Sequence, residues 1–263
     1  MRVWNRAVSP FVSALALIAL IALVVLFALP AYADRMALWK IVHDKCVVHF
    51  KAGEGPAPCD SVDLTGGEDG GVALLKDLVG VAQMLAISTR RVTGIEDPAV
   101  LEPAGSHYFA AAWAARAQVE AHLRRPLPRE AVSIAINSEF ARSQDQLHLH
   151  VDCVDKDVAA ALAANSGALD AQFRPMTLEL KGRRYWARRL DSTDLSDVSP
   201  FRLLADGIDG AKVEMGLWSL AAMPASFSGS PGFILLADRS ESGRGGHAED
   251  LQDHDCLITG PKS

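Results

Sequence analysis

The sequence predicts an α+β fold in which helices flank a mostly antiparallel sheet. Three observations support this prediction. Short apolar runs separated by turn residues indicate strands that pair as hairpins. Two longer stretches, 106–123 and 155–171, have the composition and spacing of helices. Residues 146–151 read Gln-Leu-His-Leu-His-Val, and this alternation of polar and apolar residues is typical of a half-buried strand.

The N-terminus has the features of an export signal. An uncharged apolar run at 11–29 follows Arg2 and Arg6. Ala31 and Ala33 precede Asp34 as in a signal-peptidase site, yet the run as a helix would span about 28 Å, close to the ~30 Å of bilayer hydrocarbon. We therefore expect residues 1–33 to be a cleaved signal or a retained membrane anchor. Either way, the chain after Asp34 is translocated.

About 230 residues follow this leader, enough for one large domain or two small ones. We expect a catalytic half at 34–165 and a second α+β half at 166–263, packed against the first. The net charge of −6 makes nucleic acid an improbable partner. All four cysteines lie after the leader, in a disulfide-permissive compartment, and three pairings are open. We favour Cys46–Cys59, which closes a short loop, and Cys153–Cys256, which joins the chain end to the histidine strand.

The remaining elements follow from local patterns. In the first half we expect a helix or strand at 39–48, a hairpin of strands at 71–75 and 81–87, a strand at 131–136, a polar loop at 137–143, and the histidine strand antiparallel to 131–136. In the second half we expect a hairpin at 176–180 and 185–190, a helix opened by Ser199-Pro200, a strand at 232–237, and a loop-like tail at 240–255.

The histidine strand holds the main candidate site. Residues two apart on a strand share a face, so the apolar residues Leu147, Leu149 and Val151 should face the core. The opposite, exposed face should then carry a polar ladder of Gln144, Gln146, His148, His150 and Asp152. An imidazole is close to half-protonation at neutral pH. A pair of them on one strand therefore suits nucleophilic attack with proton handling, or metal binding.

A family likeness starts from these residues. Asn137, Ser143 and the run Gln146-x-His148-x-His150 resemble the signature of the histidine-triad superfamily of nucleotide hydrolases and transferases, with Gln146 in place of its first histidine. A longer likeness covers nearly the whole mature chain, and by it the chain is identified as a member of the bacterial CDP-diacylglycerol pyrophosphatases. It rests on the N-terminal anchor, residues 38–42, Thr93-Gly94-Ile95-Glu96, residues 143–150 followed by Cys153, and His254-Asp255-Cys256.

The resemblance implies a histidine-triad-like fold and hydrolysis of CDP-diacylglycerol to CMP and phosphatidate in phospholipid metabolism, without a metal or other cofactor. His148 would be the nucleophile, and His150 would hold it or bind the phosphate. Ser143 would donate a hydrogen bond to an oxygen on which charge builds. Gln146 would supply amide donors, and Gln144, Asn137 and Arg142 would contribute to substrate binding.

The implied substrate also bears on location. Its acyl chains hold the diphosphate at the membrane surface, so a tether would raise the local concentration of enzyme and substrate. We therefore favour a single anchor in the bacterial inner membrane with the catalytic domain on the periplasmic side, over a soluble periplasmic protein. The lipid surface is then a partner, and a homo-oligomer is left open. Six arginines could contact the diphosphate or the lipid surface, although for any one of them we favour a solvent-exposed charge without such a contact. They are Arg90, Arg91, Arg183, Arg184, Arg188 and Arg189.

Two other functions remain open. A His-x-His strand also occurs in zinc enzymes, which need a further ligand, and the candidates for that ligand are His43, Asp44, His247 and His254. The second alternative is a non-catalytic module that binds a nucleotide-linked lipid on the same sheet.

Overall fold

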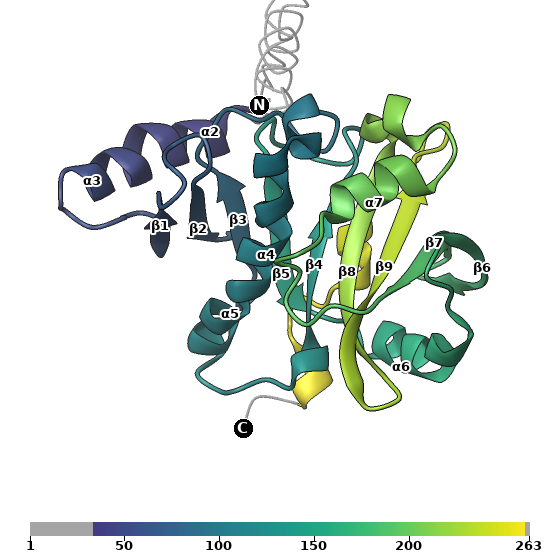
Figure 1. Ribbon diagram of the computed structural model, residues 1–263. Helices are drawn as coiled ribbons and strands as arrows, with labels where there is room; N and C mark the ends of the chain where they lie inside the picture. The colour runs from purple at the N-terminus through teal and green to yellow at the C-terminus, as the bar shows by residue number, and fades with distance from the viewer. Residues whose placement is uncertain (1–33, 261–263) are drawn as a thin grey trace, which may run out of the picture. The chain divides into compact units, whose positions relative to one another are not determined.

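The computed structural model describes residues 34–260, and these contain one nine-stranded antiparallel sheet (Figure 1). The strand order is β1-β2-β3-β5-β4-β8-β9-β7-β6. The strands are β1 (Ser61–Asp63), β2 (Val72–Lys76), β3 (Met84–Ser88), β4 (Val132–Ile136), β5 (His148–Cys153), β6 (Arg174–Leu180), β7 (Arg183–Leu190), β8 (Trp218–Phe227) and β9 (Ser230–Arg239). The predicted α+β class with a mostly antiparallel sheet is confirmed.

Helices cover both faces of this sheet. They are α2 (Ala37–Ile41), which continues through a π-helical turn (Val42–Val47) into α3 (Val48–Lys51), then α4 (His107–Ala114), α5 (Arg116–Leu123), α6 (Lys156–Asn165) and α7 (Pro200–Gly207). Helices α4, α5 and α7 lie on the face turned to the viewer in Figure 1. Their buried side chains join one large apolar core with Leu147, Leu149 and Val151, so the predicted inward face of the histidine strand is confirmed.

The opposite face has three zones. At the β1–β3 end, the N-terminal helices pack on Ala73, Leu85 and Ile87. At the β8–β9 end, α6 packs on Met223 and Ile234. Between these apolar zones β5 presents polar side chains. Among them, His150 has Leu85 of β3 as its cross-strand neighbour on one side and Ala135 of β4 on the other. A polar strip bounded by two apolar clusters therefore runs along β5, the fourth strand of the sheet.

Several local signals correspond to the observed boundaries. Asp155 is the N-cap of α6 and its side chain accepts hydrogen bonds from the backbone N–H groups of Asp157 and Val158. Ser199 caps α7 in the same way, with Pro200 at the first helical position. The predicted helix at 106–123 is present but divided at Ala115 into α4 and α5. The 39–48 segment, left open between helix and strand, is helical.

The sequence patterns did not predict β8, an inner strand of the sheet whose side chains are almost all buried. Strand β8 has no polar/apolar alternation, because both of its faces are covered, and Pro224 within it argues against a strand. It pairs with β4 through Ile134–Ala222 and Ala135–Ala221. The first and second parts of the chain therefore share a single sheet. The short strand β1 was also missed, and the tail predicted as loop contains a 3-10 turn at Ala248–Leu251.

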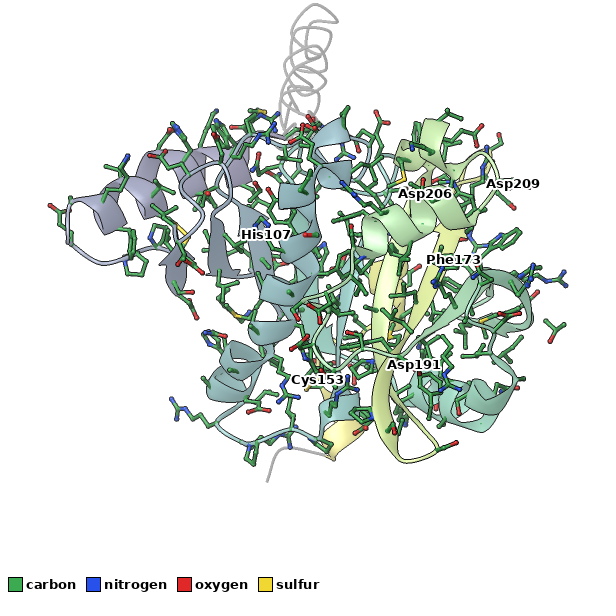
Figure 2. All side chains as sticks on the ribbon, viewed as in Figure 1. His107, Cys153, Phe173, Asp191, Asp206 and Asp209 are labelled. Carbon is green, nitrogen blue, oxygen red and sulfur yellow. A yellow bond between two sulfur atoms is a disulfide. The ribbon has the colours of Figure 1, made fainter. Side chains whose placement is uncertain are left out.

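Both favoured disulfides are confirmed. Cys46 bonds to Cys59 with a Cα–Cα distance of 5.6 Å, and Cys153 bonds to Cys256 with 5.2 Å. Cys153 ends strand β5 and is labelled in Figure 2.

Within residues 34–260, no helix has both the length and the apolar character needed to cross a bilayer. The predicted leader at 1–33 lies outside the described residues.

Candidate functional site

The two histidines of β5 are buried, which corrects the expectation of an exposed polar face. His148 is 8% exposed and His150 is 6% exposed, while Gln146 and Asp152 are fully buried. The alternation correctly separated the two faces of the strand. It could not show that a distant segment covers the polar face. That segment includes the turn at Ala248–Leu251, which packs near the end of β4 and on β8 and β9.

Local geometry fixes the protonation pattern of His148. Its Nδ1 lies 2.6 Å from the backbone carbonyl oxygen of Gln146. A carbonyl oxygen can only accept, so Nδ1 carries the proton and Nε2 keeps its lone pair. Burial, with a further contribution from His150, lowers the pKa of His148 to about 4. At neutral pH, His148 is therefore an uncharged imidazole with a free Nε2 lone pair, which suits a nucleophile.

A narrow crevice lies beside His148. It brings together four of the predicted site residues with three others, and its lining is Gly94, Ile136, Asn137, Arg142, Gln146, Leu147 and His148. Gly94 is needed for close packing here, since a Cβ at this position would lie 2.6 Å from Nη1 of Arg142. Ser143 is exposed on the preceding loop and does not line the crevice.

Gln146 has a structural task in this arrangement. Its Nε2 donates to the carbonyl oxygens of Ser88 at 2.7 Å and Arg90 at 2.8 Å, and its Oε1 accepts from Arg91 at 3.1 Å. Both amide hydrogens are thus directed at the backbone at the end of β3 and in the loop after it. Gln146 therefore fixes the start of β5 against the neighbouring loop.

Arg142 is part of a chain of ion pairs. Its two Nη atoms each lie 2.7 Å from a carboxylate oxygen of Glu96, and Nη2 lies 3.2 Å from Asp145. Asp145 also pairs with Arg35 at 2.6 Å, and the hydrogen bond from Arg35 is the main reason that the pKa of Asp145 is lowered. The charge of Arg142 is thus compensated, and its guanidinium is held at the crevice wall by bidentate contacts.

Gln144 belongs to the same loop but faces the N-terminal helices. Its Oε1 accepts a hydrogen bond of 3.0 Å from the backbone N–H of Leu38. Gln144 therefore anchors the start of α2 to the loop before β5.

His150 lies beside His148, with ring centroids 5.0 Å apart in an edge-to-face arrangement. Its Nδ1 is 2.7 Å from Nε2 of Gln83 and 3.2 Å from Oε1 of Glu249. Glu249 also accepts a hydrogen bond of 2.8 Å from Asn137, whose Oδ1 accepts from the Glu249 backbone N–H at 3.2 Å. Glu249 and Gln83 were not predicted as site residues, and no local pattern marks either one.

The last polar residue of β5, Asp152, pairs with His254 at 2.8 Å. Burial raises the pKa of Asp152, although the hydrogen bond from His254 opposes this effect. The same contact raises the pKa of His254, with burial acting against it. His254, considered above as a further zinc ligand, is thus engaged by a buried carboxyl group. Within the described part of the chain, no group of three or more His, Cys, Asp and Glu side chains is placed to hold a metal ion.

Most of the six arginines considered for phosphate or lipid contact have partners elsewhere. Four of them pair with nearby carboxylates: Arg90 with Glu102, Arg183 with Asp238, Arg184 with Glu179 and Arg189 with Asp191. Arg91 contacts Asp145 and Gln146 and so borders the candidate site.

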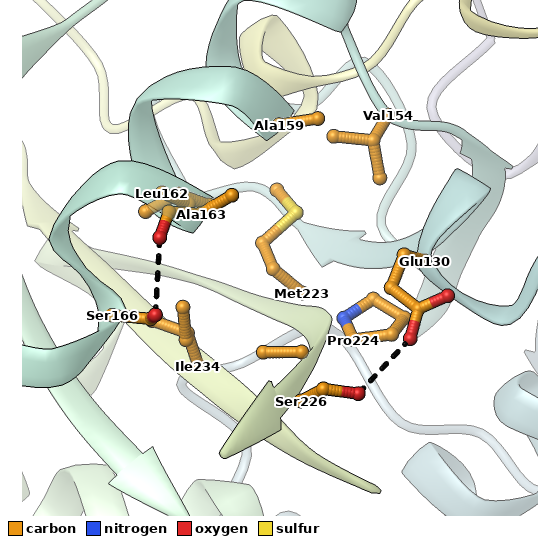
Figure 3. Close-up of a pocket in the computed structure, with 11 residues that line it drawn as sticks. Glu130, Val154, Ala159, Leu162, Ala163, Ser166, Met223, Pro224, Ser226 and Ile234 are labelled. Carbon is orange, nitrogen blue, oxygen red and sulfur yellow. Dashed lines mark hydrogen bonds between the residues drawn. The ribbon is translucent and has the colours of Figure 1, made fainter. Parts of the chain in front are cut away.

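A separate apolar cavity of about 310 Å³ lies between α6 and strands β8 and β9 (Figure 3). Met223, Leu162 and Ile234 are among its lining residues, and a hydrogen bond from Ser226 to Glu130 crosses its edge. None of its lining residues lines the crevice beside His148.

Comparison with known proteins identifies the family. Residues 33–260 match the family model described as CDP-diacylglycerol pyrophosphatase. A Yersinia pestis protein named CDP-diacylglycerol pyrophosphatase is 39% identical over 231 residues, which cover 86% of each chain. This chain belongs to the CDP-diacylglycerol pyrophosphatase family. Proteins of the same name from Mycobacterium bovis and Mycobacterium tuberculosis are 38% identical over 229 residues, which cover 86% of this chain and 85% of theirs. Membership of this pyrophosphatase family confirms the expected hydrolase.

Proposed function

We propose that this protein hydrolyses CDP-diacylglycerol to CMP and phosphatidate through a covalent nucleotidyl intermediate on His148, in the manner of the histidine-triad superfamily. The observation that carries the mechanism is the hydrogen bond from Nδ1 of His148 to the Gln146 carbonyl. It leaves Nε2 as an uncharged nucleophile at the edge of a crevice. The family supplies the substrate class, because the matching relatives carry its name.

In the first step, the lone pair of Nε2 forms a bond to the cytidylyl phosphorus. The bond from that phosphorus to the bridging oxygen breaks, and its electrons stay on the departing phosphatidate. In the second step, water attacks the same phosphorus, the phosphorus–nitrogen bond breaks, and its electrons return to Nε2. CMP leaves and the water proton passes to solvent. No separate base is needed for the first step, since His148 is already uncharged.

The crevice is narrow and leaves no room for a water molecule between its walls, so within this proposal the reacting diphosphate binds at its mouth. Within this proposal, Arg142 and Asn137 contact the phosphate oxygens from the crevice wall, and Gln146 and Gln144 keep the strand and its loop in place. The proposed role of Ser143 is to donate to the departing oxygen or to a non-bridging oxygen of the phosphate. The rate of CDP-diacylglycerol hydrolysis by the Ser143→Ala variant tests this role directly.

The site lies close to the start of the described chain. The backbone oxygen of Arg35 accepts a hydrogen bond of 2.7 Å from the N–H of Asp145, and the Arg35 side chain pairs with the same residue. Arg35 is the second residue after the leader, so a retained anchor at 1–33 would tether the protein through a segment bonded to the loop that precedes His148. This supports the proposal of an inner-membrane protein whose catalytic domain meets a lipid substrate on the periplasmic side.

A brief reaction with cytidine-labelled CDP-diacylglycerol, quenched during turnover, tests the intermediate. We expect label on the peptide that contains His148, lost in acid and retained in base, as a phosphoramidate requires. The label should be chased into CMP when unlabelled substrate is added before the quench. Turnover with no bound label, or label on a different residue, would contradict the proposal.

The acid limit of the reaction is a second test. Nε2 of His148 loses its lone pair only as the pH falls through about 4, because burial lowers the pKa of this histidine. We therefore expect the acid limb of kcat/KM to lie well below pH 6, with little loss of rate between pH 7 and pH 5.5. Initial rates across this range give the result, and a fall centred near the ordinary imidazole pKa of about 6.5 would count against a buried nucleophile.

A further inference from the structure

Residues 248–256, here called the C-terminal strap, are fastened along the end of β5. The backbone N–H of Asp253 donates to the carbonyl of Cys153 at 2.8 Å, and that of Asp155 donates to the carbonyl of Leu251 at 3.0 Å. Val154 and Gln252 form an antiparallel bridge, and the Cys153–Cys256 disulfide closes the segment. The strap therefore has a fixed position relative to the strand that carries both histidines.

The strap places Glu249 at the centre of a polar cluster. Oε1 of Glu249 accepts from Gln83 at 2.9 Å and lies 3.2 Å from Nδ1 of His150, while Oε2 accepts from Asn137 at 2.8 Å. Burial acts to raise the pKa of Glu249, but His150 and the hydrogen bonds from Gln83 and Asn137 outweigh it, so the pKa is lowered. Glu249 is therefore a carboxylate at neutral pH and can only accept hydrogen bonds.

The carboxylate determines which way the Gln83 amide points. The amide nitrogen of Gln83 has two hydrogens, and one of them is directed at Glu249. The second is directed at Nδ1 of His150. This nitrogen lies 2.7 Å from Nε2 of Gln83, closer than the 3.2 Å that separates it from Oε1 of Glu249. A donor at Nδ1 requires Nδ1 to accept, so the proton of a neutral His150 is on Nε2.

Nε2 of His150 has no hydrogen-bond partner among the described residues, although it is buried. A buried donor without a partner is costly in a folded protein, and such groups mark places where a ligand supplies the missing acceptor. The ring of His150 lies 5.0 Å from that of His148, so this donor is beside the nucleophile. A phosphate oxygen of a substrate that reacts at His148 is an acceptor of the required chemistry.

We propose that Glu249 is a positioning residue that acts through Gln83 to hold His150 as an Nε2–H donor toward the transferring phosphate, and that the C-terminal strap exists to deliver it. This inference rests on the proposed function. It assigns a task to the last part of the chain, which contributes no group to the crevice wall.

The test uses the full-length enzyme and CDP-diacylglycerol. Glu249→Gln keeps the size of the side chain but can turn N–H groups toward the donors of Gln83 and Asn137. We expect kcat to fall by about 10- to 100-fold with KM changed little, less than the 10²–10³ lost when a transition-state donor is removed outright. Asp250→Asn is the matched control on the same strap, because Asp250 faces Arg183 at 3.6 Å and is half-exposed. It should keep the wild-type rate.

Coupling to His150 separates positioning from a general structural role. If Glu249 acts through His150, the double variant Glu249→Gln with His150→Asn should be no more than about 3-fold slower than His150→Asn alone. Gln83→Met interrupts the same relay from β3 and should lower kcat by a similar factor, which keeps the proposal testable if Glu249→Gln folds poorly. Thermal unfolding of each variant checks that the fold is retained.

A wild-type kcat in Glu249→Gln, or full additivity with His150→Asn, would overturn the inference. Its failure is distinguishable from failure of the proposed function. An active His148→Ala enzyme would remove the covalent mechanism itself, whereas an inactive His148→Ala enzyme with a fully active Glu249→Gln enzyme would remove only the role of Glu249.

Discussion

Replacement of His148 with alanine is expected to lower the rate of CDP-diacylglycerol hydrolysis by at least about 10³-fold, because the proposed mechanism then has no nucleophile for its first step. The remaining rate would come from the phosphate contacts and from direct attack by water. The measurement is release of CMP from labelled substrate by the purified full-length protein in the presence of EDTA. We expect the wild-type enzyme to retain its rate with the chelator, since its first step is assigned to a side chain.

The matched control is His43→Ala. His43 lies on the N-terminal helical segment, is 47% exposed and pairs with Asp44, so its loss should leave the rate unchanged. A His148→Ala enzyme that keeps more than about a tenth of the wild-type rate would contradict nucleophilic catalysis at this position. Loss of wild-type activity in EDTA with recovery on added zinc would favour the metal-dependent alternative instead.

Removal of the Cys153–Cys256 disulfide is expected to destabilise the folded chain more than removal of the other disulfide. This bond joins residues with a sequence separation of 103, and closing so long a loop removes much conformational entropy from the unfolded chain. The chain-entropy relation gives about 4.7 kcal/mol for a loop of about 100 residues. Both cysteines are fully buried, so the double variant Cys153→Ala with Cys256→Ala avoids placing new polar groups in the core. Denaturant unfolding of the oxidised proteins measures the difference.

The second disulfide provides the comparison. Cys46 and Cys59 have a sequence separation of 13, for which the same relation predicts about 3 kcal/mol. The Cys46→Ala with Cys59→Ala variant should therefore be less destabilised, and its histidine strand should keep its cover. A reversed order of stability between the two double variants would show that loop length does not govern these effects.

Some of the site could be predicted from the sequence because strand geometry is local. The period of two in residues 146–151 separates Leu147 and Leu149 from His148 and His150 without knowledge of any neighbour. The capping residues Asp155 and Ser199 likewise act on backbone groups two or three residues away. Such signals depend on short stretches of chain, and the structure places these elements where the sequence indicated.

The missed features depend on contacts between distant segments. Glu249 meets Asn137 across a sequence separation of 112, and nothing near Glu249 marks it as a partner of the histidines. The predicted Cys153–Cys256 bond was the available indication that the tail lies against β5, but it does not specify which side chain turns inward. Strand β8 was missed for a related reason. A strand covered on both faces has no alternation, so its Ala-rich sequence with Pro224 did not indicate a central position.

The strap also affects when the enzyme becomes competent during biosynthesis. The chain is made from its N-terminus, so β5 is complete long before Cys256, which follows Cys153 at a sequence separation of 103. Nascent protein that has already formed the histidine strand would still lack the group proposed to orient His150. Its final closure needs an oxidising environment, which the cytosol does not provide. Under the proposed periplasmic location, this order would keep the site incomplete until the end of the chain has left the cytosol.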